Sequence, residues 1–405
     1  MALNVLHISE SDGIGGSGRS AFRLHSSLRR LGLGSRMLVG RRRTRDRDVR
    51  LLKRSIAWRA GDRIAGTAAD LLNLQYAFYP SSFGVALDEW FRSADVVQLY
   101  NTHGSYFSHS ALPVLSRRRP VVWRLSDMWA LTGHVAYSYD CDRWRHGCGS
   151  CPYLGEYPAL SRDTTAALWR WKNEVYRRSR LTIVAPSRWI ERLARESPLL
   201  SRFPVRRIPN GIDLERFRPT DRVEARARLG LPADGPVVLF SAPDVSDRRK
   251  GGAVLNRALE HLHGEDFQLL VAGANETPAF PRSFRSLTHL ADEDEIALSY
   301  AAADLFVLPT LAENLPNAAL ESVACGTPCV SFDVGGVPDV VRHGETGWLA
   351  PLGDAEGLAE GIRTLLRDTE LRARLARTCR EVAELEFSSE LEARRFAELY
   401  EEVLH

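Results

Sequence analysis

Residues 304–326 read DLFVLPTLAENLPNAALESVACG, a pattern that predicts a strand, a loop and a helix in succession. An apolar run ends at Pro309, a polar loop follows, and a helix is predicted from about Pro316, a good first-turn residue. Glu313 lies in the loop, and Glu321 lies about a turn and a half inside the helix. Loop amides and the positive end of a helix dipole suit a diphosphate. The two carboxylates suit the hydroxyls of a sugar or ribose.

The same alternation of short apolar runs and helical periodicity continues in both directions, which predicts α/β architecture with parallel sheets. Each half is predicted to form a doubly wound, Rossmann-like sheet with ligands at the carboxyl ends of its strands, and two such sheets facing each other would form a cleft. The predicted strands are residues 3–8, 36–40, 95–100, 120–125, 181–185, 236–241, 267–272, 304–308 and 328–332. The predicted helical faces are Ala21, Leu24, Leu28 and Leu31, and Leu358, Ile362 and Leu365.

The length and composition are those of a globular protein with two domains. The chain has 405 residues, and a domain takes roughly 100–200. Its 44% apolar and 26% charged residues exclude disordered, collagen-like and coiled-coil classes. No apolar run approaches the length of a spanning helix, and the polar residues near the N-terminus argue against a signal peptide. Six cysteines in a chain of this length form no disulfide framework, so a cytoplasmic protein is expected.

Charge is divided unevenly along the chain. Residues 1–205 hold 32 Lys and Arg against 17 Asp and Glu, whereas residues 206–405 hold 22 against 34. This division predicts two domains that meet near residue 205. The basic half indicates either an anionic partner (phosphate, acidic glycan, membrane surface or nucleic acid) or a solvated Arg-rich surface. Within it, Arg41–Arg63 is either an amphipathic membrane-surface helix or a solvated loop with a helix, and the second interpretation is favoured.

A glycine-rich loop follows the first predicted strand. Gly13, Gly15 and Gly18 satisfy the spacing G-x-G-x-x-G of dinucleotide-binding loops. However, four residues separate the strand from the first glycine, and the place of the expected ribose-binding acid holds the arginines 41–43. NADP binding is therefore an alternative, and a plain strand–helix turn is another. Whether the ligand is a dinucleotide or another phosphate, a loop at a helix N-terminus suits an anion.

A second cationic motif follows the predicted strand 236–241, in the sequence Asp-Arg-Arg-Lys-Gly-Gly at 247–252. The chain has 51 Arg and three Lys, and one of these three is Lys250. A compact ammonium serves as a point charge on phosphate, where the wider guanidinium fits less well. The alternative is a charged helix cap.

Together these motifs resemble those of retaining GT-B glycosyltransferases of family 4, and the resemblance runs over most of the chain. Each motif is weak alone, but their order is that of the family. They are GIGGSG in the first loop, APSR at 185–188, IPNGIDLERF at 208–217, RKG at 249–251, the pair Glu313 and Glu321, DVGGVPDVV at 333–341, ETGWL at 345–349 and the last helix.

The resemblance implies an N-terminal acceptor-binding domain (1–205, with a cysteine-containing insert at 127–160), a nucleotide-sugar-binding domain (206–385) and a last helix (386–405) that returns to the first domain. It implies that Arg249 and Lys250 hold the diphosphate and stabilise the leaving group without a metal. Donor contacts carried over from the family are Gly15, Gly16, Arg248, Glu313, Asn314, Leu315, Pro316, Asn317 and, for the ribose, Glu321. Glu313, Lys250, Arg249, Asp127 and His134 are the candidate catalytic residues.

Two positions depart from the family pattern. Many relatives have an arginine after the strand 236–241, where this chain reads Ala-Pro-Asp at 242–244, so the phosphate clamp would depend on Arg248 and Arg249. Relatives often have His-Asp after the strand 120–125, where this chain has Ser126 and Asp127. His103 or His134 is therefore hypothesised to replace the missing histidine contact with the donor sugar.

The insert contains Cys141, Cys148 and Cys151, and His134 precedes them. Three thiolates and one imidazole are a ligand set for structural zinc, and the alternative is a loop of thiols without metal. The sequence DMWALTG at 127–133 before these cysteines resembles a subgroup linked to exopolysaccharide, or colanic-acid-type, assembly. Cys325, Cys329 and Cys379 are predicted as core residues.

The sequence thus predicts an enzyme that moves a sugar, with retention, from a nucleoside-diphosphate-sugar to a saccharide, lipid-linked or other glycoconjugate acceptor. The expected location is the cytoplasm, with peripheral contact of the basic half at the inner face of the membrane. An NADP-dependent oxidoreductase and a non-enzymatic anion- or nucleic-acid-binding protein are the alternatives. The chain lacks a recognisable nucleic-acid-binding module, so no nucleic acid is expected as a partner. Donor base, sugar, acceptor and oligomeric state are left open.

Overall fold

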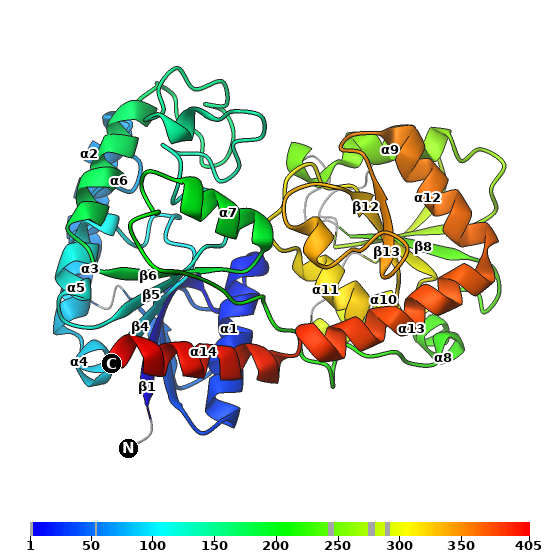
Figure 1. Ribbon diagram of the computed structural model, residues 1–405, viewed down its shortest axis with the longest axis horizontal. Coiled ribbons are helices and arrows are strands. Elements are labelled where there is room, and N and C mark those ends of the chain that lie inside the picture. The colour runs from blue at the N-terminus through cyan, green and yellow to red at the C-terminus, as the bar shows by residue number, and fades with distance from the viewer. Residues whose placement is uncertain (1–2, 53–54, 242–246, 274–279, 288–291) are drawn as a thin grey trace. The chain divides into compact units, whose positions relative to one another are not determined.

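Figure 1 shows the computed structural model, which describes residues 3–52, 55–241, 247–273, 280–287 and 292–405. The chain divides into two compact units. The first unit comprises Met1–Gly211 and Glu390–His405, and the second comprises Ile212–Ser389. Each unit is a parallel sheet covered by helices, which confirms the predicted α/β class with two Rossmann-like sheets.

The first unit holds a seven-stranded parallel sheet in the order β3-β2-β1-β4-β5-β6-β7. Consecutive residues of one strand point to opposite faces, so Val5 enters one apolar core and Leu6 the other. The strand order reverses between β1 and β4, which is where ligands of doubly wound sheets bind. The strands are β1 (Asn4–Ser11), β2 (Gly34–Arg41), β3 (Val49–Leu51), β4 (Val96–Leu99), β5 (Val121–Arg124), β6 (Leu181–Ala185) and β7 (Val205–Arg207).

Helices cover both faces of this sheet (Figure 1). Ala21, Leu24 and Leu28 are buried on α1 as predicted, but Leu31 is the exposed C-cap residue because the helix ends at Arg30. The helices are α1 (Gly15–Arg30), α2 (Ile56–Leu71), α3 (Pro80–Gly84), α4 (Glu89–Ser93), α5 (Leu112–Ser116), α6 (Thr165–Arg177), α7 (Arg188–Glu196) and α14 (Ser389–Leu404).

The second unit repeats this arrangement with six parallel strands in the order β10-β9-β8-β11-β12-β13. Leu358, Ile362 and Leu365 are buried on α12, and all three predicted core cysteines are buried. The strands are β8 (Val237–Ser241), β9 (Gln268–Ala272), β10 (Phe284–Leu287), β11 (Leu305–Leu308), β12 (Cys329–Phe332) and β13 (Gly347–Ala350). The helices are α8 (Arg222–Arg228), α9 (Gly252–Glu260), α10 (Glu293–Ala302), α11 (Asn317–Ala324), α12 (Ala355–Arg367) and α13 (Thr369–Glu386).

The last helix, α14, packs on the sheet of the first unit. Ala393, Phe396 and Tyr400 are buried there in the same core as α1. The Tyr400 hydroxyl donates to Gln98 Oε1 at 3.0 Å. Arg124 Nη1 on β5 donates to Glu392 Oε1 at 2.8 Å, and both side chains are buried. Among the helices of the described ranges, none has the length and apolar content needed to cross a membrane.

Candidate functional site

The candidate donor site of the second unit lies at the carboxyl ends of β8 and β11, where the strand order reverses. A short helical turn, Arg248–Lys250, lies against the loop that leaves β11. Leu311 N and Thr310 Oγ1 both donate to the Arg249 carbonyl, at 2.8 and 3.0 Å. These two bonds hold the RKG motif against the loop that contains Glu313.

A glycine is required where these segments meet. Gly251 has φ +72°, and a Cβ there would lie 1.8 Å from the Pro309 carbonyl oxygen. Gly335 has φ +57°, and its Cβ would lie 2.0 Å from the Glu313 carbonyl oxygen. Only glycine allows both this backbone conformation and this close approach. The glycines of RKG and DVGG therefore bring three loops together around Glu313.

Two cations face the Glu313 carboxylate. Arg249 Nη1 lies 2.5 Å from Glu313 Oε2, and Lys250 Nζ lies 3.4 Å from the same oxygen. Burial by itself raises the pKa of Glu313, but the charges of Lys250 and Arg249 and their hydrogen bonds outweigh burial and lower it. The carboxylate is thus ionised at neutral pH, and it holds both cations at the edge of the sheet. The structure therefore brings together three of the predicted catalytic residues.

Helix α11 follows this loop. Pro316 is the N-cap residue rather than the predicted first-turn residue, because α11 begins at Asn317. Within the first turn of α11, all of which the structure describes, there is no acidic side chain, and the Glu313 carboxylate ahead of the helix is paired with Arg249 and Lys250. Asn314, Leu315 and Asn317 are buried near the start of α11. This end of the helix suits a phosphate or sugar oxygen.

Two further predicted donor contacts of the second unit differ in burial. Glu321 is buried on α11, and the Tyr300 hydroxyl donates to its Oε2 at 3.4 Å. Arg248 is exposed at the start of the helical turn. The departure at residues 242–244 lies outside the described residues. The ribose contact of Glu321 and the phosphate contact of Arg248 stay predictions.

The first unit places a histidine beside Asp127 at the carboxyl ends of β4 and β5. His103 Nε2 and Asp127 Oδ2 lie 2.8 Å apart, and Tyr157 Oη lies 3.3 Å from His103 Nδ1. The other Asp127 oxygen accepts the Trp129 amide at 2.8 Å. Of the two histidines proposed to replace the missing one, His103 is therefore the one that contacts Asp127.

His134, predicted as a catalytic residue, is buried among the cysteines instead. Its Nδ1 lies 2.9 Å from the Pro158 carbonyl oxygen, and its Nε2 lies 3.4 Å from Cys151 Sγ. Burial, the largest effect, lowers the pKa of His134 despite the hydrogen bond to Pro158. Both partners belong to the cysteine-containing insert, and the catalytic role of His134 stays a prediction.

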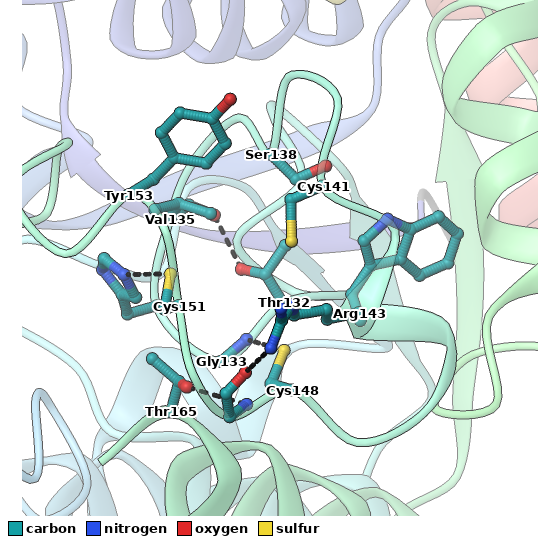
Figure 2. A pocket seen from close by; sticks show the side chains of 13 residues that line it. Thr132, Gly133, Val135, Ser138, Cys141, Arg143, Cys148, Cys151, Tyr153 and Thr165 are labelled. Carbon is teal, nitrogen blue, oxygen red and sulfur yellow. Dashed lines mark hydrogen bonds between the residues drawn. The ribbon is translucent and has the colours of Figure 1, made fainter. Parts of the chain in front are cut away.

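The predicted zinc ligands line one cavity of about 20 Å³ (Figure 2). Cys148 Sγ accepts the Gly133 amide at 3.2 Å, and burial raises the pKa of Cys148 to about 11. Across the described ranges, no group of three or more His, Cys, Asp or Glu side chains is arranged to hold a metal ion. Cys141, Cys148, Cys151 and His134 thus share a cavity without forming a coordination shell, and the zinc site stays a prediction.

Sequence reasoning did not single out Lys172, whose ammonium is buried beneath the DMWALTG segment. Its Nζ donates to the carbonyls of Trp129 and Thr132, at 2.5 and 3.0 Å, and lies 3.5 Å from the Trp129 ring centroid. Burial lowers the pKa of Lys172 to about 7. The signal was present in composition, since Lys172 is one of only three lysines in an Arg-rich chain.

The glycine loop after β1 leads into α1 without a side-chain cap from Ile14. Gly15 has φ +67°, and Gly16 follows it in the first turn. The Asp12 carboxylate accepts the amides of Arg43 and Thr44, at 2.5 and 2.8 Å. Asp12 therefore holds the segment that follows β2 against the glycine loop.

Two family profiles match the chain. One described as "Glycosyltransferase Family 4" matches residues 14–216, and one described as "Glycosyl transferases group 1" matches residues 235–368. The first covers half of the chain.

Known proteins agree with this match. A D-inositol 3-phosphate glycosyltransferase of Streptomyces bingchenggensis is 30% identical over 331 residues, covering 74% of this chain and 70% of that protein. Another from Xylanimonas cellulosilytica is 35% identical over 187 residues. This match covers 42% of this chain and 44% of that protein, so the chain spans less than half the length of several curated relatives.

The fold also resembles those of solved structures. The structure of Anabaena Alr3699/HepE in complex with UDP-glucose has a TM-score of 0.69 at 17% identity, covering 99% of this chain and 100% of that chain. At this identity the likeness shows the fold, which is that of GT-B glycosyltransferases. By family profile and by relative, the chain belongs to glycosyltransferase family 4.

Proposed function

We propose that the protein transfers a sugar from a nucleoside-diphosphate-sugar to a saccharide, lipid-linked or other glycoconjugate acceptor, with retention at the anomeric carbon. The observation that carries the proposal is the cluster of Arg249, Lys250 and Glu313 beside the N-terminus of α11. Two cations and a helix N-terminus within one loop system match a diphosphate, and a carboxylate matches sugar hydroxyls. UDP-glucose, which the HepE structure contains, is a donor of this class.

The chemistry follows from where charge develops. When the bond between the anomeric carbon and the diphosphate oxygen breaks, negative charge builds up on the leaving diphosphate. Arg249 and Lys250 stabilise this charge, and they do so without a catalytic metal in this proposal. The second unit is the donor-binding domain and the first unit the acceptor-binding domain. Retention is what the resemblance to retaining enzymes of family 4 implies, and the stereochemistry of the product tests it.

Binding of nucleotides tests the donor site. We expect one of UDP, GDP, ADP and dTDP to bind in calorimetric titrations, and NADP not to bind. Glu321→Ala should weaken the binding about tenfold or more, since a hydrogen bond to a charged group contributes about 1.5–3 kcal/mol. Glu356→Ala, an exposed acid on α12, is the matched control and should bind like the wild type. Binding of NADP alone, unchanged by Glu321→Ala, would overturn the transferase assignment in favour of the oxidoreductase.

His103 is proposed to contact the donor sugar in place of the histidine that relatives carry before Asp127. His103→Ala is expected to lower turnover about tenfold to a hundredfold, because it removes a hydrogen bond that Asp127 orients. Asp127→Asn should lower turnover as well, and the two effects should not add because the residues act as one unit. The exposed His263→Ala serves as the control. Wild-type turnover in both His103→Ala and His134→Ala would refute the hypothesis that a second histidine replaces the missing one.

A further inference from the structure

Helix α2 lies at the periphery of the first unit (Figure 1), and several of its large apolar side chains are exposed. Ile56, Ile64 and Leu71 are 85%, 74% and 70% exposed. With Ala60 between the two isoleucines, they are spaced four, four and seven residues apart, so they form one stripe along a helix of about 24 Å. We call Ile56, Ala60, Ile64 and Leu71 the α2 stripe. A group of large apolar side chains exposed together marks an interaction surface.

The inner face of α2 explains why the apolar residues point outward. The buried residues of this helix are Asp62, Gly66 and Ala69. Asp62 accepts the amide of Ser81 at 3.0 Å and its hydroxyl at 2.6 Å, at the start of α3. These bonds fix the rotation of α2 with its small and polar side toward the protein. The α2 stripe is thus held outward by specific contacts.

Charge indicates what covers the stripe. The exposed charged residues of α2 are Arg59, Arg63 and Asp70, and all three lie along the same margin of the stripe, where the two arginines outnumber the one acid. The half of the chain that contains α2 has 32 Lys and Arg against 17 Asp and Glu. Two copies meeting face to face through this surface would repel each other, whereas an anionic surface would attract it. A helix with an apolar stripe bordered by arginines is typical of helices that lie in a membrane interface.

We propose that the protein docks on anionic lipid bilayers through the α2 stripe, with Ile56, Ile64 and Leu71 entering the interface and Arg59 and Arg63 facing the lipid headgroups. The docking places the helix parallel to the membrane. The sequence favoured a solvated loop with a helix for Arg41–Arg63. This proposal favours a membrane-surface helix instead, because the apolar residues of α2 lie on its outer side. The inference is independent of the proposed transferase activity, since neither donor nor acceptor takes part in it.

Sedimentation with vesicles tests the docking. The full chain should sediment with vesicles of phosphatidylglycerol and phosphatidylcholine at low salt, but not with phosphatidylcholine alone, and 0.5 M NaCl should weaken the binding. The triple variant Ile56→Ser, Ile64→Ser and Leu71→Ser should bind at least tenfold more weakly. Because these side chains are exposed, the variant should keep the thermal stability of the wild type.

The matched control is Leu385→Ser, since Leu385 is 75% exposed on α13 of the second unit. It should bind vesicles like the wild type. The proposal is overturned if the wild type fails to sediment with anionic vesicles, or if the triple variant sediments as well as the wild type. A wild-type dimer that the triple variant converts to a monomer, without vesicle binding, would assign the surface to a second copy of the chain instead.

Discussion

Lys250→Ala is expected to lower turnover by about 10²–10³-fold, the usual effect of removing one preorganised group that stabilises charge in the transition state. The ammonium lies 3.4 Å from Glu313 Oε2, so the fold holds it in place before any substrate binds. Arg249→Ala should have an effect of similar size, since its guanidinium faces the same carboxylate oxygen. The measurement is kcat and KM for sugar transfer with the donor that calorimetry identifies.

The split between the two constants separates catalysis from binding. Stabilisation of the leaving group acts in the transition state, so most of the loss should appear in kcat. Lys250→Arg should recover only part of the rate, because a guanidinium is wider than the ammonium it replaces. Arg257→Ala, which removes an exposed cation from the neighbouring helix α9, is the control. If Lys250→Ala keeps kcat within about twofold of the wild type, the lysine has no part in the chemistry.

Glu392→Ala is expected to reduce the free energy of unfolding of the first unit by about 3–5 kcal/mol, the cost of leaving one member of a buried ion pair alone. Arg124 would then be buried against β5 without its carboxylate. Its guanidinium would still lie over the ring of Tyr100, whose centroid is 4.5 Å from Arg124 Cζ. Eight of the nine tryptophans lie in the first unit, so tryptophan fluorescence during urea unfolding reports mainly on this unit.

Two further variants isolate the ion pair from the packing of α14. Glu398→Ala removes an exposed acid from the same helix and should change the unfolding free energy by no more than about 0.5 kcal/mol. The double variant Arg124→Met with Glu392→Leu should recover much of the lost stability, because apolar residues of similar volume often replace a buried pair without loss. A loss below about 1 kcal/mol in Glu392→Ala would show that water or a rearranged side chain replaces the carboxylate.

The central strands could be predicted from the sequence, and the edge strands could not. All nine predicted strands occur, with ends that differ by a few residues. The four missed strands, β3, β7, β10 and β13, are the outermost strands of the two sheets. A central strand is buried on both faces and therefore reads as a continuous apolar run. An edge strand is partly exposed, as β7 and β10 show with two exposed residues each, so its sequence gives little signal.

Local sequence also indicated the segments that make up the candidate donor site. The RKG motif, the loop with Glu313 and the start of α11 are each short segments whose order and residue types point to a phosphate. The structure adds that hydrogen bonds and two glycines hold these loops together. Whether His103 or His134 stands beside Asp127 was not decided by sequence. The choice depends on which loop lies next to the end of β5.

The sequence by itself determined the two α/β halves, the family and the cationic loop, because these depend on the periodicity and order of residues close together in the chain. Only the tertiary structure decided three features: the contact of His103 with Asp127, the burial of Arg124 with Glu392, and the outward rotation of the α2 stripe. Each depends on residues that are distant in sequence or on which side of a helix meets the core. The contacts that satisfy buried polar groups settle such choices, and these form only when the chain is folded.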